Sequence, residues 1–218
     1  MNISIPARFS IEDFRARARA HLSRELPPEA LNPAFAPPRG DRMLNSATPE
    51  ADALAKARPA AVLASVVARP EGPTVLLTQR ASNLRSHSGQ IAFPGGKIDD
   101  GETPLAAALR EAHEEIGLAP GAVEPIGWLD PYLTGTGFRI MPLVAVVTPP
   151  FTLAINSNEV EDVFETPLSF LMDGGNHQRH QREWQGRQRH FYAMPYQGRY
   201  IWGATAGILR NLYERLYS

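Results

Sequence analysis

Residues 110–117 read REAHEEIG and place three glutamates within five positions. Side chains three and four positions apart lie on the same side of a helix, so like charges at this spacing repel each other. Such crowding costs free energy and requires a compensating charge. The residues around the stretch indicate both the element that carries the glutamates and the kind of charge that compensates them.

The glutamates are predicted to lie on a helix that begins after Thr103 and ends at Gly117. Threonine caps helix starts, proline suits the first turn, as Pro104 does here, and glycine suits the position after the last turn. At about 100° per residue, one arc of this helix is apolar and is predicted to be buried. That stripe comprises Leu105, Ala108, Leu109, Ala112 and Ile116.

The three glutamates fill a neighbouring arc, with Ala107 among them leaving open space above the helix. A solvated helix face is the simplest interpretation of clustered charges, but such faces usually mix signs at this spacing. Hard divalent cations such as Mg²⁺ and Mn²⁺ bind carboxylate oxygens together with substrate phosphates. A cation between Glu111, Glu114 and Glu115 would turn the repulsion into coordination.

A longer pattern strengthens the metal-site hypothesis. Gly96 is followed by five residues, Glu102, seven residues and then REAHEEIGL, which matches G-x5-E-x7-R-E-U-x-E-E-x-G-U, where U is apolar. The match has no departures over 23 residues, and it resembles the Nudix box. The resemblance implies an α/β fold: an α/β/α sandwich with a mixed β-sheet that hydrolyses a nucleoside diphosphate linked to another group.

The resemblance also implies roles for individual residues. Glu111 and Glu115 would be the principal Mg²⁺ or Mn²⁺ ligands, and the carbonyl of Gly96 a further one. Glu114 would be an additional ligand or help to activate water. Arg110 and Glu102 occupy positions that brace the preceding loop against the helix.

Many Nudix proteins add a carboxylate from downstream of the box, and residues 156–168, NSNEVEDVFETPL, offer four candidates. Glu159 is the first choice, because it follows a polar loop and precedes an apolar segment. The others are Glu161, Asp162 and Glu165.

The substrate is indicated by residues 76–96, LLTQRASNLRSHSGQIAFPGG, which directly precede the box. Arg80, Arg85 and His87 lie between a predicted strand and the glycine loop, and forked arginine donors suit phosphate. The stretch resembles the coenzyme A signature of the coenzyme A diphosphatases, and that resemblance extends from about residue 59 to residue 212. Alternatives are another nucleoside diphosphate substrate, such as ADP-ribose or a dinucleotide, and a non-catalytic nucleotide-sensing domain.

The rest of the chain indicates a single domain with an N-terminal extension. Residues 1–58 are predicted to form a helix at 11–22 and a proline-rich arm at 25–40, and residues 59–218 the hydrolase domain. Strands are expected at 60–69, 74–81, 90–98, 123–129, 138–147 and 187–196, with helices at 167–175 and 204–217. Strands interrupted by single helices favour a mixed sheet covered by helices on both faces.

Composition excludes several classes of protein. The 218 residues contain no cysteine and carry a formal net charge of −1, so disulfides and thiolate sites are absent and no global charge attracts nucleic acid. The N-terminus lacks a secretory signal pattern. We therefore expect a cytoplasmic enzyme that binds a small nucleotide and neither nucleic acid nor membrane. The N-terminal arm could support a homodimer.

One further segment, residues 177–199, combines five arginines with aromatic residues. This composition fits a solvated hairpin, a surface that holds an adenine ring and a phosphate, or a nucleic-acid site. The sequence leaves these interpretations open, with nucleic acid the least favoured within this family.

Overall fold

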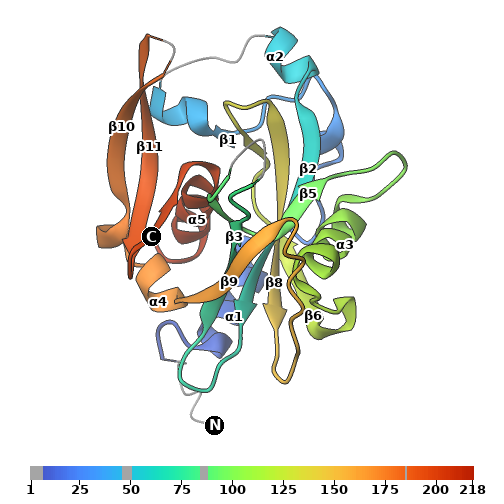
Figure 1. Ribbon diagram of the computed structural model, residues 1–218, viewed down its shortest axis with the longest axis vertical. Helices are drawn as coiled ribbons and strands as arrows, with labels where there is room; N and C mark the ends of the chain where they lie inside the picture. The colour runs from blue at the N-terminus through green and yellow to red at the C-terminus, as the bar shows by residue number, and fades with distance from the viewer. Residues whose placement is uncertain (1–6, 46–50, 84–87, 185) are drawn as a thin grey trace.

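The computed structural model describes residues 7–45, 51–83, 88–184 and 186–218. A nine-stranded mixed sheet lies at its centre (Figure 1). Its strands are β1 (Arg39–Gly40), β2 (Arg58–Val67), β3 (Thr74–Arg80), β4 (Ile91–Ala92), β5 (Gly95–Lys97), β6 (Val123–Trp128), β7 (Tyr132–Leu133), β8 (Phe138–Val147) and β9 (Val160–Pro167).

The parallel pair β2 and β8 forms the middle of this sheet, in register from Arg58 opposite Phe138 to Val67 opposite Val147. At one end β2 pairs antiparallel with β5, and at the other end with β3. β9 pairs antiparallel with β3 along nearly its whole length. Because both directions occur in one sheet, the mixed sheet predicted from the sequence is confirmed.

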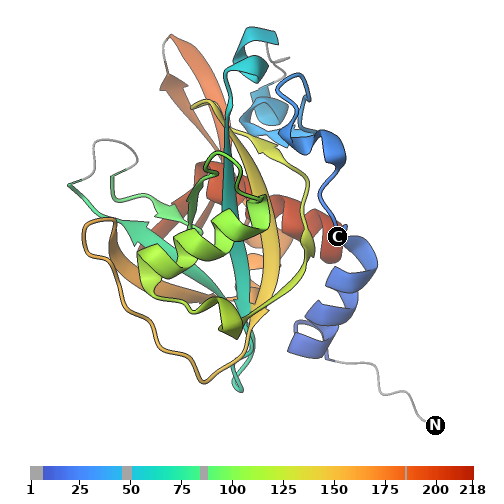
Figure 2. The same cartoon turned by 90° about the vertical axis from the view of Figure 1, so that its right-hand side faces the viewer.

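Two helical layers cover the two faces of the sheet, as Figure 2 shows. α3 (Pro104–Ile116) packs on one face, against Leu63, Leu143 and other side chains of β2 and β8. α5 (Gly203–Leu216) and α1 (Ile11–His21) share a second apolar cluster with residues such as Val66 on the opposite face. Apolar side chains thus alternate between the two faces of β2, which buries the strand on both sides.

A smaller antiparallel sheet lies beside α5 (Figure 1). It consists of β10 (Gln178–Trp184), β11 (Arg187–Tyr196) and β12 (Arg199–Trp202). Met194 and Ile201 are fully buried and belong to the same apolar cluster as α5. Segment 177–199 is therefore largely a hairpin, one of the interpretations that the sequence left open.

The N-terminal extension is docked on the hydrolase fold. Phe14 and Ala18 of α1 are fully buried in the cluster that includes α5. Arg139 of β8 is 2% exposed and donates to the carbonyl oxygens of Asn32, Pro33 and Leu54. Since carbonyl oxygens are its described partners, this buried arginine ties the arm to the sheet. The boundary at residues 58 and 59 stays a prediction.

The remaining elements are short. They are η1 (Pro28–Leu31), η2 (Asp41–Asn45), α2 (Ala51–Ala55), η3 (Pro120–Ala122), α4 (Leu168–Leu171) and η4 (Gly174–Asn176). Several of them, together with β1, β7, β9, β10 and β12, were not assigned from the sequence. Two-residue strands, such as β1 and β7, and single turns carry too little periodicity to be predicted.

The predicted buried stripe of α3 is wrong at Leu105 and Leu109, which are not buried, and it missed Ala107 and Glu115, which are. Leu105 is 39% exposed, whereas Ala107 is fully buried. The buried face consists of Ala107, Ala108, Ala112, Glu115 and Ile116. Small side chains let α3 approach β2 and β5 closely, so the buried arc is turned toward the glutamates. Glu115 consequently lies inside the protein and not at the edge of its core.

Candidate active site

The box helix is fixed at both ends as its sequence predicts. Thr103 Oγ1 accepts a hydrogen bond from Ala106 N at 3.2 Å, which caps the first turn. Gly117 has φ of 70°, and a side chain there would collide with Ala154. The close approach explains why the helix ends at glycine, where its last turn packs against the segment that leads to β9.

Arg110 binds the outer carboxylates of the box. Its Nε and Nη2 donate to the two oxygens of Glu102 at 2.8 and 2.9 Å, and its Nη1 contacts Glu111 and Glu114 at 3.0 Å each. Nη2 also donates to the carbonyl of Lys97 at 3.1 Å. The guanidinium therefore joins helix α3 to the loop before it, and its charge compensates part of the glutamate crowding.

The electrostatic consequences differ along the cluster. Hydrogen bonding to Arg110 lowers the pKa of Glu102. The pKa of Glu111 is raised, because its partial burial outweighs the contact with Arg110. Burial raises the pKa of Glu115 further, to about 7. When a group is costly to charge inside the fold, a nearby cation favours its charged form.

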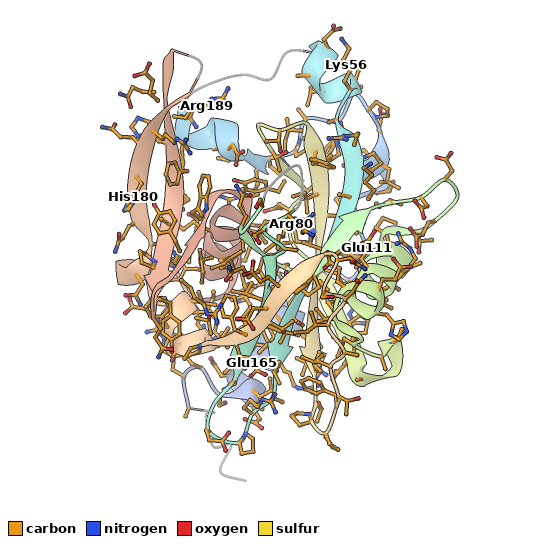
Figure 3. The ribbon with its side chains drawn as sticks, viewed as in Figure 1. Lys56, Arg80, Glu111, Glu165, His180 and Arg189 are labelled. Carbon is orange, nitrogen blue, oxygen red and sulfur yellow. The ribbon has the colours of Figure 1, made fainter. Side chains whose placement is uncertain are left out.

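Glu115 lies beneath the glycine loop and is 2% exposed. Gly95 N donates to its Oε2 at 3.1 Å, and Arg80 Nη1 lies 3.7 Å from its Oε1. The two oxygens of this carboxylate are thus approached from two sides, by the loop and by the end of β3. In the view of Figure 3, Arg80 and Glu111 lie at a similar height near the middle of the molecule.

Both glycines of the loop lie in close contact with their neighbours. Gly95 has φ of 154°, and a Cβ there would collide with Ala61 O and Val62. A Cβ on Gly96 would collide with the carboxylate of Glu111. The backbone of Gly96 and this carboxylate are therefore in direct contact, and glycine allows that close approach.

Glu159 lies near the same carboxylates. Asn156 Nδ2 donates to Glu159 Oε1 at 3.2 Å. The backbone carbonyl of Glu159 accepts from Ala81 N, next to Arg80, at 2.9 Å. Its charge contributes to raising the pKa values of both Glu111 and Glu115. Asn156 was not singled out from the sequence, although its N–H also donates to the Glu115 carbonyl and so fixes the loop to the helix.

The other downstream acids are engaged elsewhere. Glu165 pairs with Arg69 at 2.6 Å, and Figure 3 places it further down β9, away from Arg80. Asp162 pairs with Arg199 at 2.7 Å. Glu161 is exposed. Arg85 and His87 lie outside the described residues.

The oxygen atoms available at the site are of the kind that a hard divalent cation binds. Glu111, Glu115 and Glu159 offer carboxylate oxygens, and the raised pKa values mark negative charge that a cation would stabilise. Among the described residues, no three acids or histidines are gathered tightly enough to enclose an ion. Arg110 holds Glu111 and Glu114, while Glu115 faces Gly95 and Arg80, so these side chains are partnered within the protein.

The comparison with known families agrees with this geometry. The NUDIX domain model matches residues 57–185, which include the glycine loop, the box helix and Glu159. The chain belongs to the Nudix family. It is a Nudix hydrolase of the class that acts on nucleoside diphosphate-linked substrates, and such enzymes generally use divalent metals.

Curated relatives give the same family. The protein described as "Uncharacterized Nudix hydrolase NudL" from Cronobacter sakazakii is 45% identical over 156 residues, which cover 71% of this chain and 81% of the relative. Its counterpart from Escherichia coli K12 is 42% identical with the same coverage. The DR0079 protein of Deinococcus radiodurans is 16% identical, with a TM-score of 0.46 over 72% of this chain and 83% of its own.

No helix in the described part of the chain is both long and apolar enough to cross a membrane.

Proposed function

We propose that this Nudix hydrolase cleaves the diphosphate of coenzyme A or its derivatives, releasing adenosine 3′,5′-bisphosphate and 4′-phosphopantetheine. The observation that carries the proposal is the stretch LLTQRASNLRSHSGQIAFPGG, similar to the coenzyme A signature, directly before the box. Arg80 near its start and Gly95 near its end both contact Glu115. Substrate contacts from this loop and chemistry at the box would therefore act on one bound molecule.

In the proposed site, Glu111 and Glu115 hold a Mg²⁺ or Mn²⁺ ion, with the Gly96 carbonyl and Glu114 as further donors. A cation bound there would neutralise the diphosphate and favour ionisation of water. The attacking water oxygen forms a bond to phosphorus, and the bridging P–O bond breaks to leave two phosphate monoesters.

Two carboxylates are candidates to accept the proton of the attacking water. Glu114 is half exposed beside Glu111, and Glu159 contributes charge to both Glu111 and Glu115. Arg110 and Glu102 keep the loop fixed against α3 during the reaction. A positioned general base contributes typically 10²–10⁴-fold to rate.

Arg85 and His87 are proposed to bind substrate phosphate. Coenzyme A carries a ribose 3′-phosphate besides its diphosphate, and dedicated arginine contacts to it would explain a pattern beside the box but not within it. A hydrogen bond to a charged group is worth about 1.5–3 kcal/mol, which is roughly ten- to a hundredfold in binding.

The cytoplasm is the proposed location and a homodimer the proposed assembly.

The test compares kcat/KM for coenzyme A and dephospho-coenzyme A in the wild type and in Arg85→Ala. We expect the wild type to prefer coenzyme A by about tenfold or more and Arg85→Ala to narrow that preference. Arg19→Ala, which removes an exposed arginine of α1, serves as the matched control and should leave the preference unchanged. Equal efficiency of the wild type on both substrates would contradict the 3′-phosphate argument.

A parallel panel of ADP-ribose, a dinucleotide and nucleoside triphosphates, with Mg²⁺ and Mn²⁺ and product identification, distinguishes the alternatives. Cleavage of one of these with no cleavage of coenzyme A would assign a different Nudix substrate. Tight nucleotide binding without any cleavage would assign a sensing domain instead.

A further inference from the structure

Arg80 is held at a fixed place at the end of β3. Its N–H donates to Gln90 O at 2.9 Å, and its carbonyl accepts from Gly89 N at 3.1 Å. The pairing of β3 with β9 shifts by one residue between Gln79 and Arg80, so that Arg80 lies opposite Val160. Such a bulge re-aims a side chain. Here the side chain of Arg80 extends to Glu115, on the face covered by α3.

The contact between Arg80 and Glu115 is a charge pairing and not a fork of hydrogen bonds. Nη1 lies 3.7 Å from Oε1, beyond normal hydrogen-bond distance. Arg80 Nε is buried and has no hydrogen-bond partner among the residues that the structure describes. A planar guanidinium fitted to a carboxylate would use two parallel donors. Arg80 therefore contributes mainly its positive charge.

Glu115 does not depend on Arg80 for its position. Its other oxygen, Oε2, accepts from Gly95 N at 3.1 Å, and its backbone lies within α3. Within the described part of the chain, Arg80 is the one cation paired with this carboxylate, because Arg110 pairs with Asp99, Glu102, Glu111 and Glu114 instead. Removing Arg80 would leave the carboxylate in place but without a positive neighbour.

We propose that Arg80 is the internal counter-ion of Glu115, supplying in the metal-free protein the positive charge that a divalent cation supplies when bound. This role rests on the proposed use of Glu115 as a metal ligand, and it differs from the phosphate contact expected from the sequence. Arg80 and the cation then compete for the same negative charge. Without Arg80, a cation bound at Glu115 would be repelled by one positive charge fewer.

The experiment measures the Mn²⁺ dissociation constant by calorimetry at pH 8.5, without nucleotide, for wild type, Arg80→Gln and Arg80→Met. We expect both variants to bind Mn²⁺ about fivefold to fiftyfold more tightly than the wild type, because one charge at short range interacts strongly in a partly buried site. Arg80→Lys keeps the charge and should bind within about threefold of the wild type. KM for coenzyme A should stay within about threefold in all of them.

Arg69→Gln is the matched control, because Arg69 pairs with Glu165 at 2.6 Å and its loss removes the same charge far from the box. Its Mn²⁺ affinity should equal that of the wild type. Unchanged or weaker Mn²⁺ binding in both Arg80→Gln and Arg80→Met would overturn the proposal. A tenfold rise in KM for coenzyme A with unchanged Mn²⁺ binding would instead indicate that Arg80 contacts the substrate.

The two levels of the argument fail differently. If the wild type binds Mn²⁺ and cleaves coenzyme A while the Arg80 variants bind Mn²⁺ no more tightly, only the counter-ion role is lost. If the wild type cleaves no coenzyme A but the variants show the tighter binding, the counter-ion role stands and the substrate assignment is lost. Circular dichroism of each variant shows whether it folds, and either uncharged variant suffices for the comparison.

Discussion

The two arginines of the site differ in how closely they contact their carboxylate partners. Arg110 lies at the outer side of α3 and contacts Glu102, Glu111 and Glu114 at 2.8 to 3.0 Å. Arg80 approaches the inner Glu115 only to 3.7 Å, although that residue is the most buried of the set. Within the fold, ion pairs with Arg110 compensate the charges of the outer carboxylates. The negative charge of Glu115 remains costly, and a bound cation would lower that cost.

The largest expected effect is on turnover. Glu115→Gln and Glu111→Gln should each lower kcat by roughly a thousandfold or more, about 4 kcal/mol in the barrier, because each replaces a charged metal donor with a neutral one. The measurement is kcat at saturating Mg²⁺, with Glu161→Gln as an exposed control. Near-normal rates in either variant would show that the inner and outer carboxylates have been assigned to the wrong chemistry.

The metal-free stability of the protein should depend on pH through Glu115. Its folded pKa is about 7 against a reference of 4.5, so its favourable contribution is complete below pH 4.5 and is lost as pH rises to 7. That difference corresponds to roughly 3 kcal/mol. In EDTA, Glu115→Gln should therefore be more stable than the wild type at pH 8, and the advantage should vanish near pH 4.5. Urea unfolding at both pH values measures this; a variant less stable than wild type at pH 8 would contradict the cost assigned to the inner charge.

Gly96→Ala tests the packing of the outer carboxylate against the loop. The added Cβ would collide with the carboxylate of Glu111, so either the loop or the side chain must move. We expect kcat/KM to fall roughly tenfold to a hundredfold, since small displacements at a catalytic centre are costly. Gly121→Ala is the matched control, because no atom lies within 4 Å of its added Cβ. Equal activities of the two variants would mean that the contact is irrelevant to catalysis.

The smallest effect is expected from the outer arginine itself. Arg110→Gln should lower the metal-free free energy of unfolding by about 1–2 kcal/mol, because one partly exposed charge in a network is removed. The control is Lys56→Gln, whose pair with Asp52 is exposed and should contribute less than about 0.5 kcal/mol. Denaturant unfolding in EDTA compares the two. A loss from Arg110→Gln no larger than that of the control would remove the contrast between the outer and inner arginines.

Much of the fold could be predicted from local sequence. The capped helix from Thr103 to Gly117 and the apolar runs at β2, β3 and β8 each carry a pattern that repeats over many residues. The α/β class followed from these runs, and the match to the box indicated the Nudix family. The same patterns could not specify β9 or β10, because strands rich in polar residues show little apolar alternation.

The sequence by itself determined which chemical groups the site contains: a run of carboxylates, a glycine loop and nearby arginines at fixed spacing. Only the tertiary structure decided how they are partnered. Packing of the alanines of α3 on β2 and β5 turned Glu115 inward and left Leu105 exposed. The bulge at the end of β3 brought Arg80 to Glu115, while Glu165, in the same polar segment as Glu159, was drawn to Arg69. Spacing along the chain fixes which residues share a face, but burial and charge pairing depend on what the sheet brings against that face.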